Sequence, residues 1–134
     1  MLDRYLFRGK GVLSKAWQIG HYFQCMMEHY IRFPKTPKHE VLVDPTTIGQ
    51  CTGLRDKNGK LIFEGDIIKT KMFGKKVSRG CNMSGYDYFT IVFTDGSFML
   101  DTKERSFTAT YIPGKESHYE VVGNIHDNPE LLEV

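Results

Sequence analysis

Short apolar segments separated by glycine-containing turns constrain this chain more than any other feature of its sequence. The 134 residues include 13 glycines, which recur at short intervals throughout. Asp95-Gly96 lies between two apolar runs, and an Asp-Gly pair readily supplies the positive φ angles of a two-residue hairpin turn. Asn58-Gly59 closes a polar stretch between two further runs. Brief runs joined in this way predict a mainly β protein of short antiparallel strands.

The second half of the sequence contains the clearest hairpins. We expect turns at 55–60, which includes Asp56, and at Glu64-Gly65-Asp66. In chain order, the expected strands are 50–54, 61–63, 67–70, 88–94, 97–100, 107–112 and 118–122, with Pro113-Gly114 between the last two. Residues 127–132 predict a short C-terminal helix, with Asn128 as its cap and Pro129 in its first position.

The first half is less regular. Strands are expected at 2–7 and from 16 through 23, with a turn at 9–11. Residues 21–33 fit either a helix or a strand, and their aromatic and β-branched content favours strands with a loop. Pro34 and Pro37 indicate a surface connection before a strand at 39–43.

Composition limits the class of protein. A chain of this length is near the commonest size of one domain, and its 40% hydrophobic residues suffice for a core. The net charge of +2 is too small to predict nucleic-acid binding by itself. Three widely spaced cysteines fit reduced thiols, and no apolar run suits a signal peptide or a membrane span. We therefore expect a cytoplasmic protein without membrane contact.

Four motifs, in order, resemble one family. They are Phe7-Arg8-Gly9-Lys10 with Trp17 and Gly20, then QCTGLRDKNGKLIFEGDIIK at 50–69, the Asp95-Gly96 hairpin, and VVGNIHDNPELLE at 121–133. This pattern is similar to the YopX family of phage and prophage proteins, although 23–40 and 72–87 lie outside it. The resemblance implies a mainly β fold with barrel character, a phage or prophage origin in a host cell, and no established activity or catalytic residues. With the length of the chain, we expect a single YopX-like domain over 1–134. We divide it into a β meander at 1–45 and a part at 46–134 with small-barrel, SH3-like character.

Three groups of residues invite a chemical interpretation, and each has a simpler one. Asp56, Glu64 and Asp66 suit a metal or acid–base site, but Asp in such turns commonly bonds backbone amides. His21, Cys25 and His29 suit zinc only if they lie on a helix, and otherwise indicate ordinary core positions. No motif brackets the third group, Cys81, Ser84 and His126. We therefore predict no catalytic residue, metal or cofactor.

The basic stretch after residue 68 is the leading candidate for binding. Its cations and aromatic rings are the kind that small β-barrels use for single-stranded nucleic acid. The candidate residues are Lys69, Lys71, Phe73, Lys75, Lys76, Arg79, Tyr86 and Tyr88. A solvated loop or a lysine-protected sheet edge would have the same composition.

The sequence thus predicts a non-catalytic binding module for nucleic acid or for a host or phage protein. Self-assembly into a homo-oligomer is the alternative, with Trp17, Tyr22 and Phe23 forming subunit contacts. An enzyme is the third and least supported hypothesis.

Overall fold

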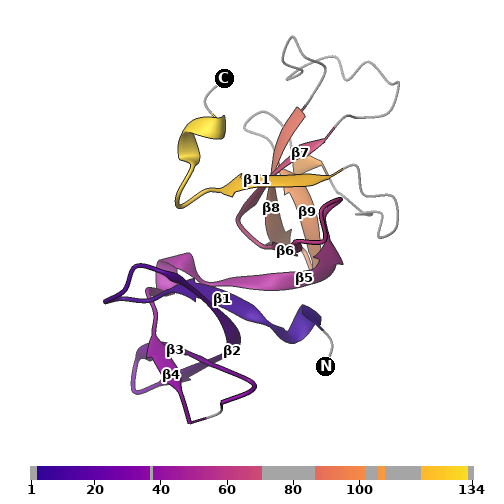
Figure 1. Ribbon diagram of the computed structural model, residues 1–134. Helices are drawn as coiled ribbons and strands as arrows, with labels where there is room; N and C mark the ends of the chain where they lie inside the picture. Colours follow the sequence, from indigo (N-terminus) through magenta and orange to yellow (C-terminus); the bar gives the residue numbers. More distant parts are fainter. Residues whose placement is uncertain (1–2, 37, 71–86, 102–105, 108–118, 133–134) are drawn as a thin grey trace. The chain divides into compact units, whose positions relative to one another are not determined.

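The computed structural model describes residues 3–36, 38–70, 87–101, 106–107 and 119–132 (Figure 1). The chain divides into two compact units, 1–53 and 54–134. Both consist of antiparallel strands, and the helices among the described residues are single 3-10 turns. The expected mainly β fold is confirmed.

The first four strands of the N-terminal unit form a meander, and the fifth pairs with the first. After a 3-10 turn, η1, at Asp3–Tyr5, the strands of this unit are β1 (Phe7–Lys10), β2 (Trp17–Cys25), β3 (Glu28–Arg32), β4 (Glu40–Leu42) and β5 (Gly49–Arg55), with the 3-10 turn η2 at Pro45–Thr47 before β5. The order in the sheet is β4-β3-β2-β1-β5-β6, where β6 is Leu61–Phe63. The strands predicted within 21–33 are confirmed as β2 and β3, since aromatic and β-branched residues favour extended backbone.

Two glycines let the backbones of this unit approach closely. Ile31 and Val43 are buried on one face of the sheet, and Gly9 lies against Val43. A Cβ atom added at Gly20 would stand 2.3 Å from the carbonyl oxygen of Arg32. That distance is far below van der Waals contact, so β2 can pair with β3 in this way only with glycine at position 20.

The C-terminal unit contains a second antiparallel sheet. The strands of this second sheet are β7 (Asp66–Thr70), β8 (Asp87–Thr94), β9 (Ser97–Asp101), β10 (Ser106–Phe107) and β11 (Glu120–Asn124), and the chain then forms η3 at Pro129–Leu132. The sheet has the order β10-β9-β8-β7-β11. Its core consists of Ile62, Ile68, Phe89, Ile91, Leu100 and Tyr119. Asp95 and Gly96, with φ angles of 50° and 81°, form the turn between β8 and β9.

Three local predictions were wrong. Residues 3–5 form a 3-10 turn, and the first strand begins only at Phe7. Gly9 and Lys10 belong to that strand because they pair with Gln18 and Trp17, so the turn follows them. Asn128 lies at the cap position, where its backbone oxygen accepts from the N–H of Leu131, but its side chain does not cap the turn: the Oδ1 atom accepts from the backbone N–H of Asn124, which precedes it in the chain. Pro129 does begin that turn, and residues 108–118, including Pro113-Gly114, lie outside the described part.

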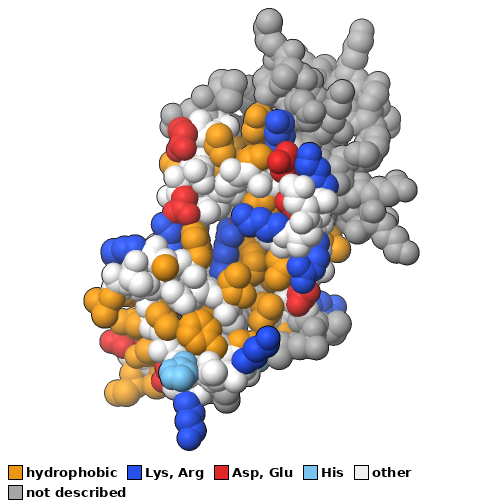
Figure 2. Space-filling view, in the orientation of Figure 1, with side chains coloured by type: hydrophobic (Ala, Val, Ile, Leu, Met, Phe, Trp, Pro, Cys, Tyr) orange, Lys and Arg blue, Asp and Glu red, His pale blue; other side chains and the backbone are white. Residues whose placement is uncertain are grey.

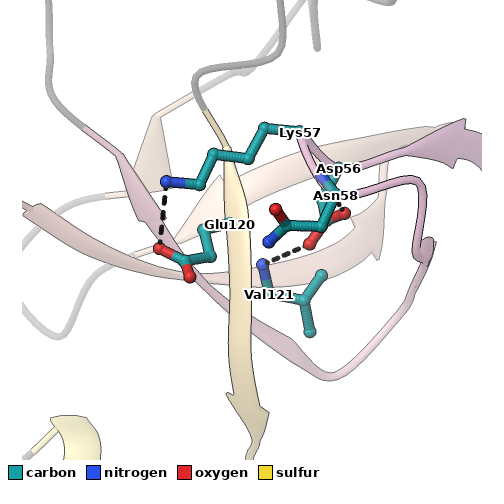
Figure 3. A network of polar contacts seen from close by, with 5 residues as sticks. All are labelled: Asp56, Lys57, Asn58, Glu120 and Val121. Atoms are coloured by element: carbon teal, nitrogen blue, oxygen red, sulfur yellow. Dashed lines mark hydrogen bonds and ion pairs between the residues drawn. The ribbon is translucent and has the colours of Figure 1, made fainter.

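Asp56 joins the turn after β5 to β11 (Figure 3). It is 6% exposed, and its Oδ1 accepts from the backbone N–H groups of Asn58 and Lys60 at 2.8 and 2.9 Å. Its Oδ2 accepts from the N–H of Val121 at 3.0 Å, and Lys57 pairs with Glu120 at 3.4 Å. Burial raises the pKa of Asp56, but these backbone donors outweigh it and hold the pKa below its ordinary value.

Gly20→Ala should lower the free energy of unfolding by about 1–3 kcal/mol, the usual cost of overpacking. The new methyl group meets the Arg32 carbonyl, which is fixed in the backbone of β3. Urea unfolding measures the change. Gly96→Asn is the control, because nothing lies within 4 Å of that site and asparagine tolerates a positive φ. A Gly20→Ala protein as stable as the wild type would contradict the close approach of β2 and β3.

Asp56→Asn should lower the free energy of unfolding at neutral pH by about 2–3 kcal/mol, because charge-assisted hydrogen bonds are lost. A group with a depressed pKa stabilises the fold above its unfolded pKa of about 3.9 and loses that effect as the pH falls through its folded pKa. The difference in the free energy of unfolding between wild type and variant should therefore decrease at acidic pH, as measured by urea unfolding at several pH values. Asp95→Asn, in an exposed turn, should change little at any pH.

Candidate ligand-binding face of the N-terminal sheet

The strand register gathers cations and aromatic rings on one face of the N-terminal sheet. Directly paired residues of antiparallel strands share a face, and alternate residues along one strand do so too. Lys10 pairs with Trp17, Arg8 with Ile19, His21 with Arg32, and Phe23 with Tyr30. The cation–aromatic face, as we call it, therefore comprises Arg8, Lys10, Trp17, Ile19, His21, Phe23, Tyr30 and Arg32.

Cation–π and stacking contacts order these side chains. The guanidinium carbon of Arg8 lies 4.6 Å from the centre of the Trp17 ring, and the Lys10 Nζ atom lies 5.5 Å from it. The guanidinium carbon of Arg32 lies 4.5 Å from the Phe23 ring centre. Phe23 and Tyr30 stack with their centres 5.2 Å apart and their planes 14° apart. Such contacts hold the Trp17 and Phe23 rings beside positive charges.

Most of this face is accessible. Arg8 is buried, Ile19 and Arg32 are exposed, and the other five side chains are partly exposed. The N-terminal unit carries seven Lys and Arg against four Asp and Glu, a net charge of +3, although the whole chain carries only +2. Figure 2 shows hydrophobic side chains with Lys and Arg at their borders in the lower part of the view, on the N-terminal unit. The positive balance therefore belongs to the unit that presents the aromatic rings.

Two acidic residues lie at one edge of the cation–aromatic face. Glu40 forms an ion pair with Arg32 at 3.0 Å, and Glu28 accepts a hydrogen bond of 2.6 Å from the Tyr30 hydroxyl. This hydrogen bond, followed by desolvation and nearby negative charges, raises the pKa of Tyr30 above its ordinary value. Tyr30 therefore stays neutral well into the alkaline range.

The opposite face of the sheet is structural. Phe7 packs against Tyr22 with ring centres 5.5 Å apart, and Tyr22 shares a hydrogen bond of 2.7 Å with the Nδ1 atom of His29. Ile31 and Val43, the most buried apolar residues of the unit besides Cys51, also belong to this side of their strands. Trp17 and Phe23, expected to join Tyr22 in subunit contacts, therefore lie on the other face from it.

An open apolar pocket adjoins the cation–aromatic face at Ile19. It has a volume of about 500 Å³ and is lined by Leu6, Ile19, Phe33, Pro34 and Lys35. All five residues belong to the N-terminal unit. Lys35 is the one charged residue among them, so the pocket suits an apolar group that carries a negative charge beside it.

The basic stretch predicted from the sequence is only partly described. Lys69 of β7 pairs with Tyr88 of β8 on one side and with Glu120 of β11 on the other. Lys71, Phe73, Lys75, Lys76, Arg79 and Tyr86 lie outside the described residues.

The predicted acidic group lies in two turns and at the first residue of β7. The Asp56 carboxylate accepts hydrogen bonds from backbone N–H groups, and the Oδ2 atom of Asp66 accepts from the N–H of Phe63 at 2.7 Å. Glu64 and Gly65 form the corner between β6 and β7, and Gly59 and Gly65 adopt φ angles of 83° and 89°. Among the described residues, no three His, Cys, Asp or Glu side chains gather as a metal site would require.

The histidine and cysteine group is divided between two faces. His21 and Cys25 lie on the cation–aromatic side of β2, whereas His29 pairs with Gln24 on the opposite side. The two-residue turn at Met26-Met27 shifts the alternation between β2 and β3, so the three residues do not share a side. The expected core position is wrong for Cys25, which is exposed. His126 lies in the turn after β11, and Cys81 and Ser84 are outside the described part.

Sequence reasoning missed the cation–aromatic face as a site. The alternation of Trp17, Ile19, His21 and Phe23 was visible in the sequence and placed them on one side of a strand. The pairing that brings Arg8 and Lys10 from β1 and Tyr30 and Arg32 from β3 beside them was not visible. It depends on where the turns begin and end, which the sequence predicted less well.

The protein is mainly β, and its N-terminal sheet has one structural face and one cation–aromatic face. A family model described as YopX protein matches residues 6–133, and the chain belongs to this family. Among solved structures, the crystal structure of protein EF1440 from Enterococcus faecalis is similar, with 28% sequence identity and a TM-score of 0.53. The similarity covers 94% of this chain and 96% of that one. No curated protein matches the sequence.

Within the described part of the chain, no helix has the length and apolar character required to span a membrane.

Glu28→Gln should lower the pKa of Tyr30 toward the ordinary value of a tyrosine. The neutral amide still accepts the phenol proton but no longer repels the phenolate that forms at high pH. The ¹³C shift of the Tyr30 Cζ atom, followed through an alkaline titration, measures this. Glu120→Gln, in the other unit, is the control and should leave Tyr30 unchanged. An unchanged Tyr30 pKa in Glu28→Gln would mean that the two side chains do not meet.

Proposed function

We propose that this protein is a non-catalytic binding module and that its cation–aromatic face binds single-stranded nucleic acid. The observation that carries the proposal is the pairing of aromatic rings with cations on one accessible sheet face. Arg8 and Lys10 lie over Trp17, and Arg32 lies over Phe23. Bases stack on aromatic rings, and phosphates pair with nearby positive charges, for which Lys10 and Arg32 are accessible whereas Arg8 is buried.

The dimensions of the face suit several nucleotides. Trp17 and Phe23 are six residues apart on β2, which corresponds to roughly 20 Å at about 3.3 Å per residue. Tyr30 extends the aromatic surface from β2 to β3. A strand of nucleic acid running along β2 would therefore meet separate stacking positions in succession.

The chemistry favours a single strand over a duplex. In a duplex the bases stack on one another, so the rings of a sheet surface cannot reach their faces. The unit's net charge of +3 is also small for a protein that holds onto duplex phosphates. Stacking, supported by a few cations, is the better explanation of the residues present.

The proposal has a rival surface and a rival ligand. The basic stretch from Lys69 to Arg79, predicted from the sequence, would bind nucleic acid mainly through phosphates. A phage or host protein would instead use the aromatic rings as apolar anchors and show little dependence on salt. Membership of the YopX family supports a phage or prophage origin, and with it a place in the host cytoplasm, as part of the same proposal.

Trp17→Ala and Phe23→Ala should each weaken the binding of an oligonucleotide by about 5- to 150-fold. This corresponds to about 1–3 kcal/mol for each stacked base. Fluorescence anisotropy of a labelled oligodeoxythymidine at several salt concentrations measures the affinity. Because Trp17 is the only tryptophan, its fluorescence gives a second readout in the wild type. Lys10→Gln should reduce the salt dependence, since one phosphate contact is lost.

The control is Phe93→Ala, which removes an exposed aromatic ring in the C-terminal unit and should not change the affinity. A double variant, Lys75→Glu with Lys76→Glu, tests the basic stretch in parallel. Loss of binding in that variant alone would move the binding surface to the basic stretch. Absence of binding by the wild type at low salt would refute nucleic acid as the ligand and favour a protein partner.

A further inference from the structure

The turn between β2 and β3 presents two methionines to solvent. Met26 and Met27 have φ angles of 48° and 73° and are 92% and 88% exposed. Two-residue turns of this kind favour Asn-Gly, since both positions require a positive φ. Methionine is sterically disfavoured in this conformation and gains nothing from exposure to water. Neither local structure nor solvation explains this pair, which makes contact with another molecule its most direct explanation.

The apolar pocket beside Ile19 complements this tip. Methionine side chains are unbranched and adaptable, so they fill irregular apolar spaces well. The pocket volume of about 500 Å³ accommodates such side chains, and its lining is apolar apart from Lys35. Glu28 directly follows Met27 and is exposed, so an inserted tip brings a carboxylate toward Lys35. The two surfaces thus match in both polarity and charge.

The tip of a molecule cannot enter its own pocket. Ile19 lines the pocket and lies in β2, whereas Met26 follows the last residue of the same strand. Seven residues of extended chain separate them by roughly 23 Å. The strand that joins the two surfaces also holds them apart.

We infer that the Met26-Met27 tip of one copy inserts into the Leu6–Ile19–Phe33–Pro34–Lys35 pocket of a second copy. Such a contact is heterologous, because it joins two different surfaces. It leaves one tip and one pocket free, so that further copies add to form a ring or an open chain. The contact is small, and we therefore expect weak, concentration-dependent association. This inference is independent of the proposed nucleic-acid binding.

Two variants that each remove one half of the contact test it. Met26→Asn with Met27→Gly removes the apolar tip but supplies the pair that the turn prefers. Ile19→Glu places a carboxylate in the pocket, where it repels Glu28 of an incoming tip, and position 19 is 44% exposed and tolerates a polar residue. Sedimentation velocity from micromolar to millimolar concentration measures the mass. Leu13→Asn, which removes a residue 94% exposed in another turn, is the matched control.

The wild type and Leu13→Asn should show an average mass that rises above 15.5 kDa with concentration, while both test variants remain at 15.5 kDa. An equimolar mixture of the two test variants should form a dimer of twice that mass and nothing larger. The tip variant retains its pocket and the pocket variant its tip, so one productive contact remains between them. Circular dichroism and thermal unfolding of each variant confirm that a low mass does not reflect unfolding.

Three results would overturn the inference. The first is a wild type that remains at 15.5 kDa throughout the range. The second is a test variant that associates like the wild type. The third is a mixture of two folded, monomeric variants that forms no dimer, because a tip-to-pocket contact requires that the two complement one another.

Discussion

The pairing of β2 with both β1 and β3 is the constraint on which the N-terminal unit depends. A strand paired on both sides has a fixed register, and the register decides which side chains lie on each face. A slip of one residue would exchange Trp17 and Phe23 with Gln18 and Gln24. The close approach of Gly20 to the Arg32 carbonyl fixes that register sterically, since no other residue of β2 is a glycine. The accessible face is thus specified by contacts made on the opposite one.

In the C-terminal unit, a different interaction anchors strand β11. Three backbone N–H groups converge on the buried Asp56 carboxylate, and one of them belongs to Val121, 65 residues further along the chain. Strand β11 in turn pairs with β7, which begins at Asp66, directly after the turn that follows β6. The Asp56 side chain, in the loop between β5 and β6, therefore fixes β11, which lies at the edge of the second sheet. This explains why the carboxylates of this region are better understood as parts of the scaffold than as reactive groups.

The accuracy of sequence reasoning follows from the range of the interactions involved. The turn at Asp95-Gly96 was predictable because its conformation depends on two adjacent residues, and the strands beside it followed from simple alternation. The turn at 9–11 was wrong because Gly9 serves close packing against Val43 instead of chain reversal. The side-chain cap at Asn128 was wrong because the Asn128 side chain accepts a hydrogen bond from the backbone N–H of Asn124. The cation–aromatic face combines three strands, and no local pattern indicates which residues of β1 and β3 complete it.

Turns also distinguish positions that serve folding from those that do not. At Asp95-Gly96 the residues, the positive φ angles and the exposure agree, as expected where a turn only reverses the chain. At Met26-Met27 the same backbone conformation carries residues that the conformation and the solvent both disfavour. Since the two hairpins have equal loop lengths, chain reversal alone cannot account for the methionines. A disagreement between a local preference and the residue present is most informative in such a case, because a second turn in the same protein shows what folding alone requires.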